Sequence, residues 1–216
     1  MILGIYGSGG TGREVYDMAV RRNAVSALWN EIVFIDDFRG EGLWYGTRSL
    51  RFETLQQENT PFQCIVAIGE PMDREMMYNK LMAAGISLAT LVDPTALISP
   101  TAKIGAGTIL CEFSTIRADV QIGCNCLIQP YCCIGHNIHV GDHSIISAFS
   151  APGGWSAYGK RVFVGMHASI RDKITIGDDV IIGMGAAVFQ DVPAGATVVG
   201  NPARITRGNA GHNVFR

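Results

Sequence analysis

The sequence predicts two structural parts: a small α/β domain over residues 1–91 and an all-β solenoid of parallel strands over residues 92–207, followed by a C-terminal tail at 208–216. Two observations support this division. A glycine-rich loop separates an apolar segment from a helical segment near the N-terminus, and an aliphatic residue returns at every sixth position in the second part. A helix repeats every 3.6 residues and a strand every two, so neither alone explains a period of six.

The composition narrows the class of protein. Only 17% of the 216 residues are charged, and the formal net charge is −2 without a basic stripe, which argues against nucleic-acid binding. No apolar run is long enough to span a membrane and the first ten residues lack a basic leader, so we expect a cytoplasmic protein without membrane insertion. Five of the six cysteines fall within the periodic region, where we expect reduced thiols that fill the core.

The N-terminal segment has the order strand, glycine-rich loop, helix. A strand is predicted at 2–6, the loop GSGGTG follows at 7–12, and a helix begins near Arg13. Glycines let the backbone approach a phosphate, and a helix start offers free N–H groups and the positive end of its dipole. The same pattern also occurs as a purely structural turn. The predicted phosphate-binding residues are Ser8, Gly9, Gly10 and Thr11.

Further strands complete the first domain. The strand predicted at 32–35 ends at Asp36 and Asp37, where carboxylates accept hydrogen bonds from a ribose or a base. About four strands precede the solenoid, too few for the two halves that bind a dinucleotide, so we expect a mononucleotide group instead of NAD. Trp44 and Tyr45 lie in a Gly-rich loop and either stack on a ligand or pack on the surface.

The period of six defines the second part. From Val92 to Val188 it keeps one register, and only Pro152 and Tyr158 interrupt the aliphatic series. Glycine often follows the aliphatic residue, where we expect a turn to need free backbone angles. A six-residue unit covers only one small face and must stack on its neighbours, as in a solenoid. A β-sandwich is the alternative, but it requires loops of uneven length.

Together these features resemble one branch of the hexapeptide-repeat acyltransferases, the bacterial sugar acetyltransferases of the sialic-acid O-acetyltransferase type. The resemblance covers nearly the whole chain, including the junction at 92–94 (VDP) and the closing motif at 199–204 (VGNPAR). It implies a Rossmann-like first domain that holds a nucleotide, and a left-handed parallel β-helix in which three hexapeptides form one coil. It also implies a homotrimer in which neighbouring prisms form the acetyl-CoA groove.

The resemblance also implies the reaction. Its best-understood members transfer acetyl from acetyl-CoA, without a metal, to the 4-amino group of a nucleotide-linked 4-amino-4,6-dideoxy sugar. The family's catalytic histidine falls on His136, and an imidazole suits a base that deprotonates the attacking amine near neutral pH. The groove for acetyl-CoA falls on Ile145, Met166 and Met184. O-acetylation of a sugar hydroxyl and nonenzymatic binding of a nucleotide sugar remain as alternatives.

The sequence departs from the family pattern beside the histidine. A carboxylate usually follows that histidine, whereas this chain has Asn137. With three hexapeptides in each coil, Asp119 lies one coil before Asn137, so we expect Asp119 to orient the imidazole. The segment 151–155 (APGGW) brings two glycines and Trp155 about one coil beyond His136, either as part of the site or as a local irregularity.

A zinc site is the other interpretation of the histidines. A related prism family binds zinc through two histidines five residues apart and a third from a neighbouring coil. The spacing here does not match, so we expect no metal. The histidines concerned are His136, His139, His143, His167 and His212.

Overall fold

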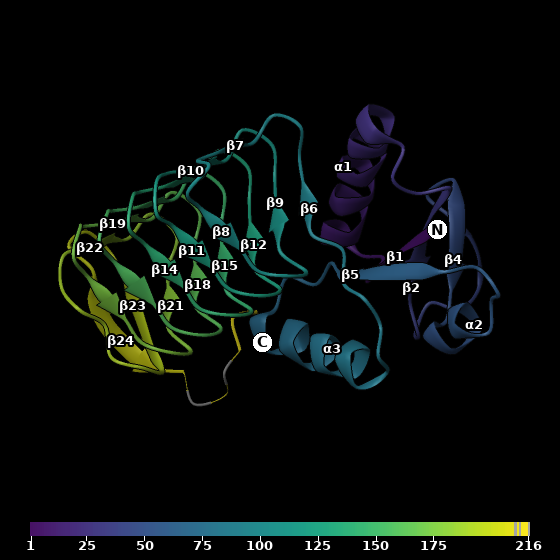
Figure 1. The fold of residues 1–216 in the computed structure, drawn as a ribbon. Helices are drawn as coiled ribbons and strands as arrows, with labels where there is room; N and C mark the ends of the chain where they lie inside the picture. Colours follow the sequence, from purple (N-terminus) through teal and green to yellow (C-terminus); the bar gives the residue numbers. More distant parts are fainter. Residues whose placement is uncertain (210, 212, 216) are drawn as a thin grey trace.

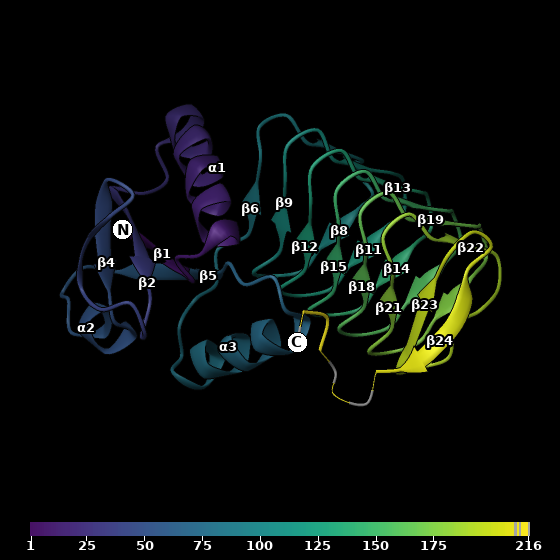
Figure 2. The same cartoon turned by 180° about the vertical axis from the view of Figure 1, so that it is seen from behind.

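The computed structural model describes residues 1–209, 211 and 213–215, and it divides into an α/β domain and a triangular prism of short strands. Figure 1 shows the α/β domain in purple and blue beside a prism that runs from teal to yellow. Figure 2, from behind, shows α1 between the sheet of the first domain and the first coils of the prism, and α3 below the sheet with one end near the prism. No helix among the described residues is long and apolar enough to cross a membrane.

The first domain is a five-stranded sheet in the order β3-β4-β2-β1-β5. All its strand pairs are parallel except the β3–β4 hairpin. Its strands are β1 (Ile2–Tyr6), β2 (Glu31–Ile35), β3 (Gly42–Trp44), β4 (Thr47–Leu50) and β5 (Phe62–Val66). Its helices are α1 (Gly10–Ser26), α2 (Phe52–Gln56) and α3 (Pro71–Ala83), so α1 begins three residues earlier than expected. Alternate residues of β1 face opposite cores, with Leu3 and Ile5 on the α1 side and Tyr6 among the residues near α3.

The prism consists of two-residue strands, each paired in parallel with the equivalent strand of the next coil, three hexapeptides along the chain. Ile109 pairs with Leu127 in this way, and Leu127 pairs with Ile145. The coil length expected from the sequence is therefore confirmed.

Three faces result from this pairing. The covered face contains β6 (Leu91–Val92), β9 (Ile109–Leu110), β12 (Leu127–Ile128), β15 (Ile145–Ile146), β18 (Phe163–Val164) and β21 (Ile181–Ile182), and ends with β23 (Ala196–Val199) and the antiparallel β24 (Arg204–Gly208). The small-residue face contains β7 (Leu97–Ile98), β10 (Thr115–Ile116), β13 (Cys133–Ile134), β16 (Ala151–Pro152), β19 (Ser169–Ile170) and β22 (Ala187–Val188). The polar face contains β8 (Lys103–Ile104), β11 (Gln121–Ile122), β14 (His139–Val140), β17 (Ala157–Tyr158) and β20 (Thr175–Ile176).

The every-sixth residues fill the centre of the prism. Ile128, Ile134 and Val140 are fully buried, and the two interruptions, Pro152 and Tyr158, take the same inward position and are buried as well. A break in the aliphatic series is therefore not a break in the prism.

The reason for the glycines after these residues differs from the expectation. Gly105 and Gly141 do not have the positive φ of a left-handed turn; that conformation falls two residues later, for example at Asn137 with φ 56°. A Cβ on Gly105 would lie 2.4 Å from the backbone carbon of Gly123 in the next coil. Glycine is required here because successive coils pass too close for a side chain, so the dihedral argument is wrong.

The two domains share one hydrophobic junction. Leu91, Ile109 and Leu127 on the covered face pack into the same apolar cluster as Leu3 and Ile5. Arg74 of α3 is fully buried and donates hydrogen bonds to the carbonyls of Val66, Ile68 and Asn125, the last from a prism corner. This side chain ties α3 to the prism.

The predicted tail also touches the first domain. Residues 210, 212 and 216 of this tail lie outside the described residues. The amides of Val214 and Phe215 donate to the carboxylate of Glu70, and the ring of Phe215 packs edge-on against Phe163.

Candidate active site

The glycine-rich loop and the ends of two strands line one cleft of about 700 Å³, which α3 closes on its other side. The cleft brings together all six residues that the sequence assigned to nucleotide binding: Ser8, Gly9, Gly10, Thr11, Asp36 and Asp37. A Cβ on Gly9 or Gly10 would meet nothing within 4 Å, so the loop is open toward the cleft. Gly12 is different, because a Cβ there would lie 2.1 Å from the carbonyl oxygen of Gly7. Glycine therefore serves two purposes in this loop: Gly12 allows the close contact with Gly7, and Gly9 and Gly10 leave the start of the helix accessible.

Both aspartates are held by protein donors. Asp36 accepts hydrogen bonds from the Ser8 hydroxyl and from the amides of Phe38 and Arg39. Burial raises the pKa of Asp36, but these hydrogen bonds outweigh it and leave the pKa below the ordinary value.

The pKa of Asp37 is lowered in the same way. Burial raises it, but hydrogen bonds from Tyr6, the Phe52 amide and Lys80 outweigh that effect. Both carboxylates are therefore ionised at neutral pH.

Trp44 and Tyr45 pack on protein groups. The guanidinium carbon of Arg39 lies 3.7 Å from the centre of the Trp44 ring, and Trp44 Nε1 donates to the carbonyl of Ser8 at 3.2 Å. Tyr45 donates from its hydroxyl to Asp17 at 3.0 Å and lies edge-on to Tyr16. Of the two interpretations, stacking on a ligand and packing on the surface, the structure supports packing. The hydrogen bond from Trp44 also holds the glycine-rich loop at Ser8.

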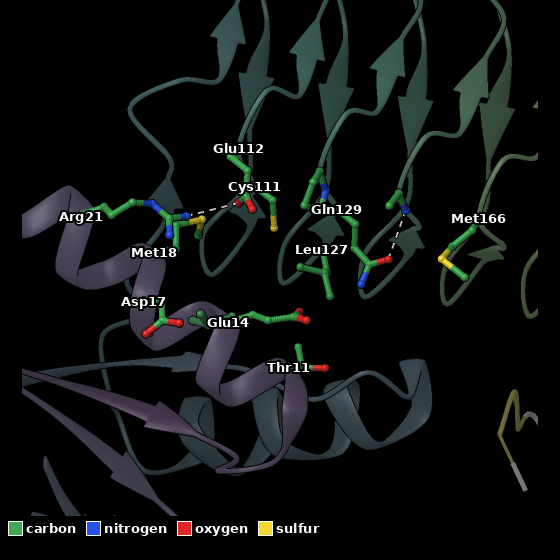
Figure 3. A pocket seen from close by; sticks show the side chains of 13 residues that line it. Thr11, Glu14, Asp17, Met18, Arg21, Cys111, Glu112, Leu127, Gln129 and Met166 are labelled. Carbon is green, nitrogen blue, oxygen red and sulfur yellow. Dashed lines mark hydrogen bonds and ion pairs between the residues drawn. The ribbon is translucent and has the colours of Figure 1, made fainter. Parts of the chain in front are cut away.

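A second pocket, of about 340 Å³, lies between α1 and the prism corner that joins the covered face to the small-residue face. Figure 3 shows the side chains of Thr11, Glu14 and Gln129 pointing into this space. The Gln129 side-chain oxygen accepts from the Ala148 amide at 3.2 Å, which leaves its NH₂ group available. Thr11 lines this pocket and the cleft beside the glycine-rich loop, so the two cavities meet there.

His136 lies on the next corner, where β13 turns into β14. It lines a shallow hollow with Arg117 and Ala118. Its Nδ1 is 2.9 Å from the side-chain oxygen of Asn137, and its ring lies edge-on to Trp155 with 6.0 Å between the ring centroids. An amide oxygen accepts only, so in the neutral imidazole this contact places the proton on Nδ1 and the free lone pair on Nε2. A Cβ on Gly154 would lie 2.9 Å from the ring, so glycine at that position leaves room for the imidazole.

Asp119 lies on the same corner one coil earlier, but its carboxylate makes no hydrogen bond or ion pair with His136 among the described residues. Its backbone amide donates to Thr101 at 2.9 Å. The ring partner in this structure is Asn137, the residue that the sequence argument treats as a departure. An orienting role for Asp119 stays a prediction.

The three residues expected at the acetyl-CoA groove divide between two places. Met166 and Met184 lie on successive coils of the corner beside α1, and both are exposed. Ile145 is buried on the covered face against the first domain. The structure therefore brings the two methionines together but not Ile145.

The same corner carries an aromatic ladder that the sequence analysis missed. Its rings are Phe113, Tyr131, Phe149 and His167. The rings stack with centroids 4.9–5.0 Å apart and planes within 19° of parallel. Their uniform spacing of one coil along the chain is the signal that could have found them.

The other histidines do not converge. His143 is buried, with Nδ1 3.0 Å from the Asn125 side-chain nitrogen, and burial lowers its pKa. His139 lies on the polar face, and His167 is in the ladder. Within residues 1–209, 211 and 213–215 no three metal-binding side chains gather, and His212 lies outside the described residues.

Two family descriptions match this chain. Residues 3–81 match the PglD N-terminal domain, and residues 119–151 match the bacterial transferase hexapeptide with six repeats. The first match covers the domain with the glycine-rich loop and its cleft, and the second includes Asp119, His136 and Asn137.

Curated and solved relatives cover nearly the whole chain. GDP-perosamine N-acetyltransferase from Escherichia coli O157:H7 is 28% identical, over 94% of this chain and 95% of that protein. The acetyltransferase domain of PglB from Neisseria gonorrhoeae FA1090, solved with acetyl coenzyme A, has a TM-score of 0.88 at 28% identity, over 95% of this chain and 98% of that one. PerB from Caulobacter crescentus, solved with CoA and GDP-perosamine, has a TM-score of 0.87 at 25% identity, over 96% and 98%.

These matches confirm the fold, an α/β domain followed by a β-helix of the same hand as in these relatives, since a prism of opposite hand would not superpose. The chain is homologous over nearly its whole length to the hexapeptide-repeat sugar acetyltransferases, the family that its sequence resembles.

Proposed function

We propose that this chain is an acetyl-CoA-dependent N-acetyltransferase that acts on the 4-amino group of a nucleotide-linked 4-amino-4,6-dideoxy sugar, with His136 as general base. One observation carries the proposal. The imidazole of His136 is fixed through Nδ1 by Asn137, while Nε2 is left with a free lone pair on an exposed corner. A base needs such an oriented, unprotonated nitrogen to accept a proton from the acceptor.

The chemistry assigned to His136 is one proton transfer. As the sugar amine forms a bond to the thioester carbonyl carbon, Nε2 takes the proton that the amine loses. The C–S bond then breaks, and this proton passes to the departing sulfur, so that CoA leaves as the thiol and the imidazole is neutral again. Asn137 keeps Nδ1–H in place, so that the nitrogen facing the substrate is the acceptor. General-base assistance of this kind typically contributes about 10²- to 10⁴-fold to the rate.

The nucleotide fits the cleft of the first domain. The diphosphate would lie at the start of α1, where Gly9 and Gly10 expose free N–H groups and the helix dipole favours an anion. The sugar would then pass Thr11 into the pocket between α1 and the prism, where Glu14 and the Gln129 NH₂ offer an acceptor and donors. Met166 borders this pocket, and Met184 follows on the next coil, in keeping with acetyl-CoA along this corner.

A homotrimer completes the site in this proposal. The small-residue face separates the α1 pocket at one edge from His136 at its other edge, so one chain does not bring them together. This face exposes Cys133, Ala151 and Ser169 and half-buries Thr115, and its strands carry no charge, which suits close packing against a second copy. In a cyclic assembly, the His136 edge of one subunit meets the α1 edge of the next. In this proposal the reaction takes place in the cytoplasm, where acetyl-CoA is available.

The direct test is a mass-spectrometric screen of nucleotide-linked amino sugars and their hydroxyl counterparts with acetyl-CoA. An increase of one acetyl mass on the amino sugar alone supports the proposal, and the same increase on the hydroxyl sugar would favour O-acetylation. Binding without any acetyl transfer would favour a nonenzymatic binding protein. His136→Asn, which removes the base but keeps a polar side chain of similar size, serves as the catalytic control.

A further inference from the structure

The wall of the nucleotide cleft nearest α3 contains a linked group of three polar side chains. Lys80 of α3 places Nζ 2.8 Å from the Tyr6 hydroxyl and 2.9 Å from Asp37 Oδ2. The Tyr6 hydroxyl in turn donates to Asp37 Oδ2. All three side chains line the cleft.

Most of the donors and acceptors of this group are used within the group itself. Asp37 already accepts from the Phe52 amide at Oδ1 and from Tyr6 and Lys80 at Oδ2. Tyr6 gives its only proton to Asp37, and its pKa is raised to about 12 by burial and by Asp37, so it remains protonated at neutral pH. An ammonium group has three N–H bonds, and only two of those on Lys80 are used. The unused group is therefore a donor.

Apolar side chains border the same part of the cleft. Phe38, next to Asp37, is fully exposed, and Met76, one turn before Lys80 on α3, is 56% exposed. An exposed phenylalanine and a polarisable thioether are suited to the faces of a flat aromatic ring. Nucleobases present such faces, and stacking on aromatic side chains binds any of them, because every base has a flat face. A hydrogen bond to the edge of the base can then distinguish one base from another.

We infer that Lys80 reads the edge of the nucleobase and selects a base with a carbonyl oxygen there, as in guanine, uracil and thymine, over adenine and cytosine, which carry an amino group at that position. This inference rests on the proposed function, because it assumes that the nucleotide part of the substrate occupies this cleft. The third N–H of Lys80 donates to a carbonyl oxygen, whereas an amino group would face a donor and a positive charge. A site built to hydrogen-bond one edge rejects the other strongly, since its polar group is left unpaired.

The test compares nucleoside diphosphates in matched pairs, UDP with CDP and GDP with ADP, by calorimetric titration of the full chain without acetyl-CoA. In whichever pair the cleft binds, we expect the nucleotide with the carbonyl oxygen, UDP or GDP, to bind at least about tenfold more tightly than CDP or ADP. In Lys80→Gln the side-chain amide can also accept, so the preference should fall to within about threefold. Lys80→Arg keeps only donors and should keep the preference.

The matched control is Lys103→Gln on the polar face, which should change neither affinity. Thermal unfolding of each variant shows that the fold is retained, and Lys80→Arg keeps the test decisive if Lys80→Gln unfolds. Equal binding of both members of each pair by the natural protein would overturn the inference. An equal loss for both members in Lys80→Gln would also overturn it, because that is the pattern of a phosphate contact. In either case the acetyl transfer of the proposed function would stand, whereas binding of no nucleotide at all would contradict both.

Discussion

The two edges of the small-residue face are built in different ways. At the α1 edge, two elements enclose a pocket whose polar groups are fixed by partners: Arg21 pairs with the buried Asp93 at 2.9 Å, and Gln129 with the Ala148 amide. At the other edge, His136 stands on an open corner with a single side-chain hydrogen bond, to Asn137. In the proposed function the first edge binds the substrates and the second accepts the proton. The difference between the edges then means that one chain carries two half-sites, which a second copy would complete.

Removal of the base gives the largest expected effect. His136→Asn should lower kcat by about 10²- to 10⁴-fold, since it removes the proton acceptor from one edge only. Nucleotide affinity, measured by calorimetry, should stay unchanged because the cleft is not touched. A weakened affinity with an unchanged kcat would break the division between the two edges.

A charge in the glycine-rich loop should act on the other edge. Gly10→Asp fits sterically, because a Cβ there meets nothing within 4 Å, but its carboxylate would repel a diphosphate at the helix start. We expect nucleotide affinity to fall about a hundredfold by calorimetry. Gly10→Ala is the matched control and should bind almost as the natural protein does. Equal affinities for the Asp and Ala variants would remove the diphosphate from this position.

Arg74 tests how the two parts are held together. Arg74→Met keeps an unbranched side chain close to the apolar part of arginine but leaves the carbonyls of Val66, Ile68 and Asn125 without their donor. The free energy of unfolding in denaturant should fall by about 2–4 kcal/mol, because several buried acceptors lose their partner. An unchanged stability would mean that the junction depends on apolar packing alone.

The smallest effect concerns the orientation of the imidazole. Asn137→Ala should lower kcat by about tenfold, equivalent to one hydrogen bond of about 1.4 kcal/mol, with little change in KM. Asp119→Asn tests the proposal that this carboxylate also orients the ring. Its effect should be smaller, because no hydrogen bond joins it to His136 in the structure. A larger fall in Asp119→Asn than in Asn137→Ala would reverse that order.

The sequence predicted the fold well because the repeat is a physical consequence of stacking. Each hexapeptide must bury its aliphatic residue, so the pattern at Ile128 and Ile134 predicts the prism from the sequence alone, without the contacts between coils. The interruption at Pro152 and Tyr158 did not matter, since each fills the same inward space.

The details that failed depend on contacts between coils and between domains. The need for glycine at Gly105 comes from the next coil, and the packing of Trp44 comes from Arg39, neither of which a local pattern contains. The atom that meets the ring of His136 also depends on local contacts: the Asn137 side chain supplies an oxygen in this structure, and an orienting role for the Asp119 carboxylate stays a prediction. Spacing along the chain predicts which residues share a corner, but not which atoms meet.

Mixing the two impaired variants, at a substrate concentration too low to saturate the Gly10→Asp cleft, tests the central claim most directly. His136→Asn subunits keep an intact cleft, and Gly10→Asp subunits keep an intact base. If each site combines the cleft of one subunit with the base of the next, random mixing in equal amounts restores about a quarter of the sites of a closed trimer. We predict acetyl transfer near that fraction of the natural rate after dissociation and reassembly. Activity that stays at the level of the separate variants would contradict a site shared between subunits.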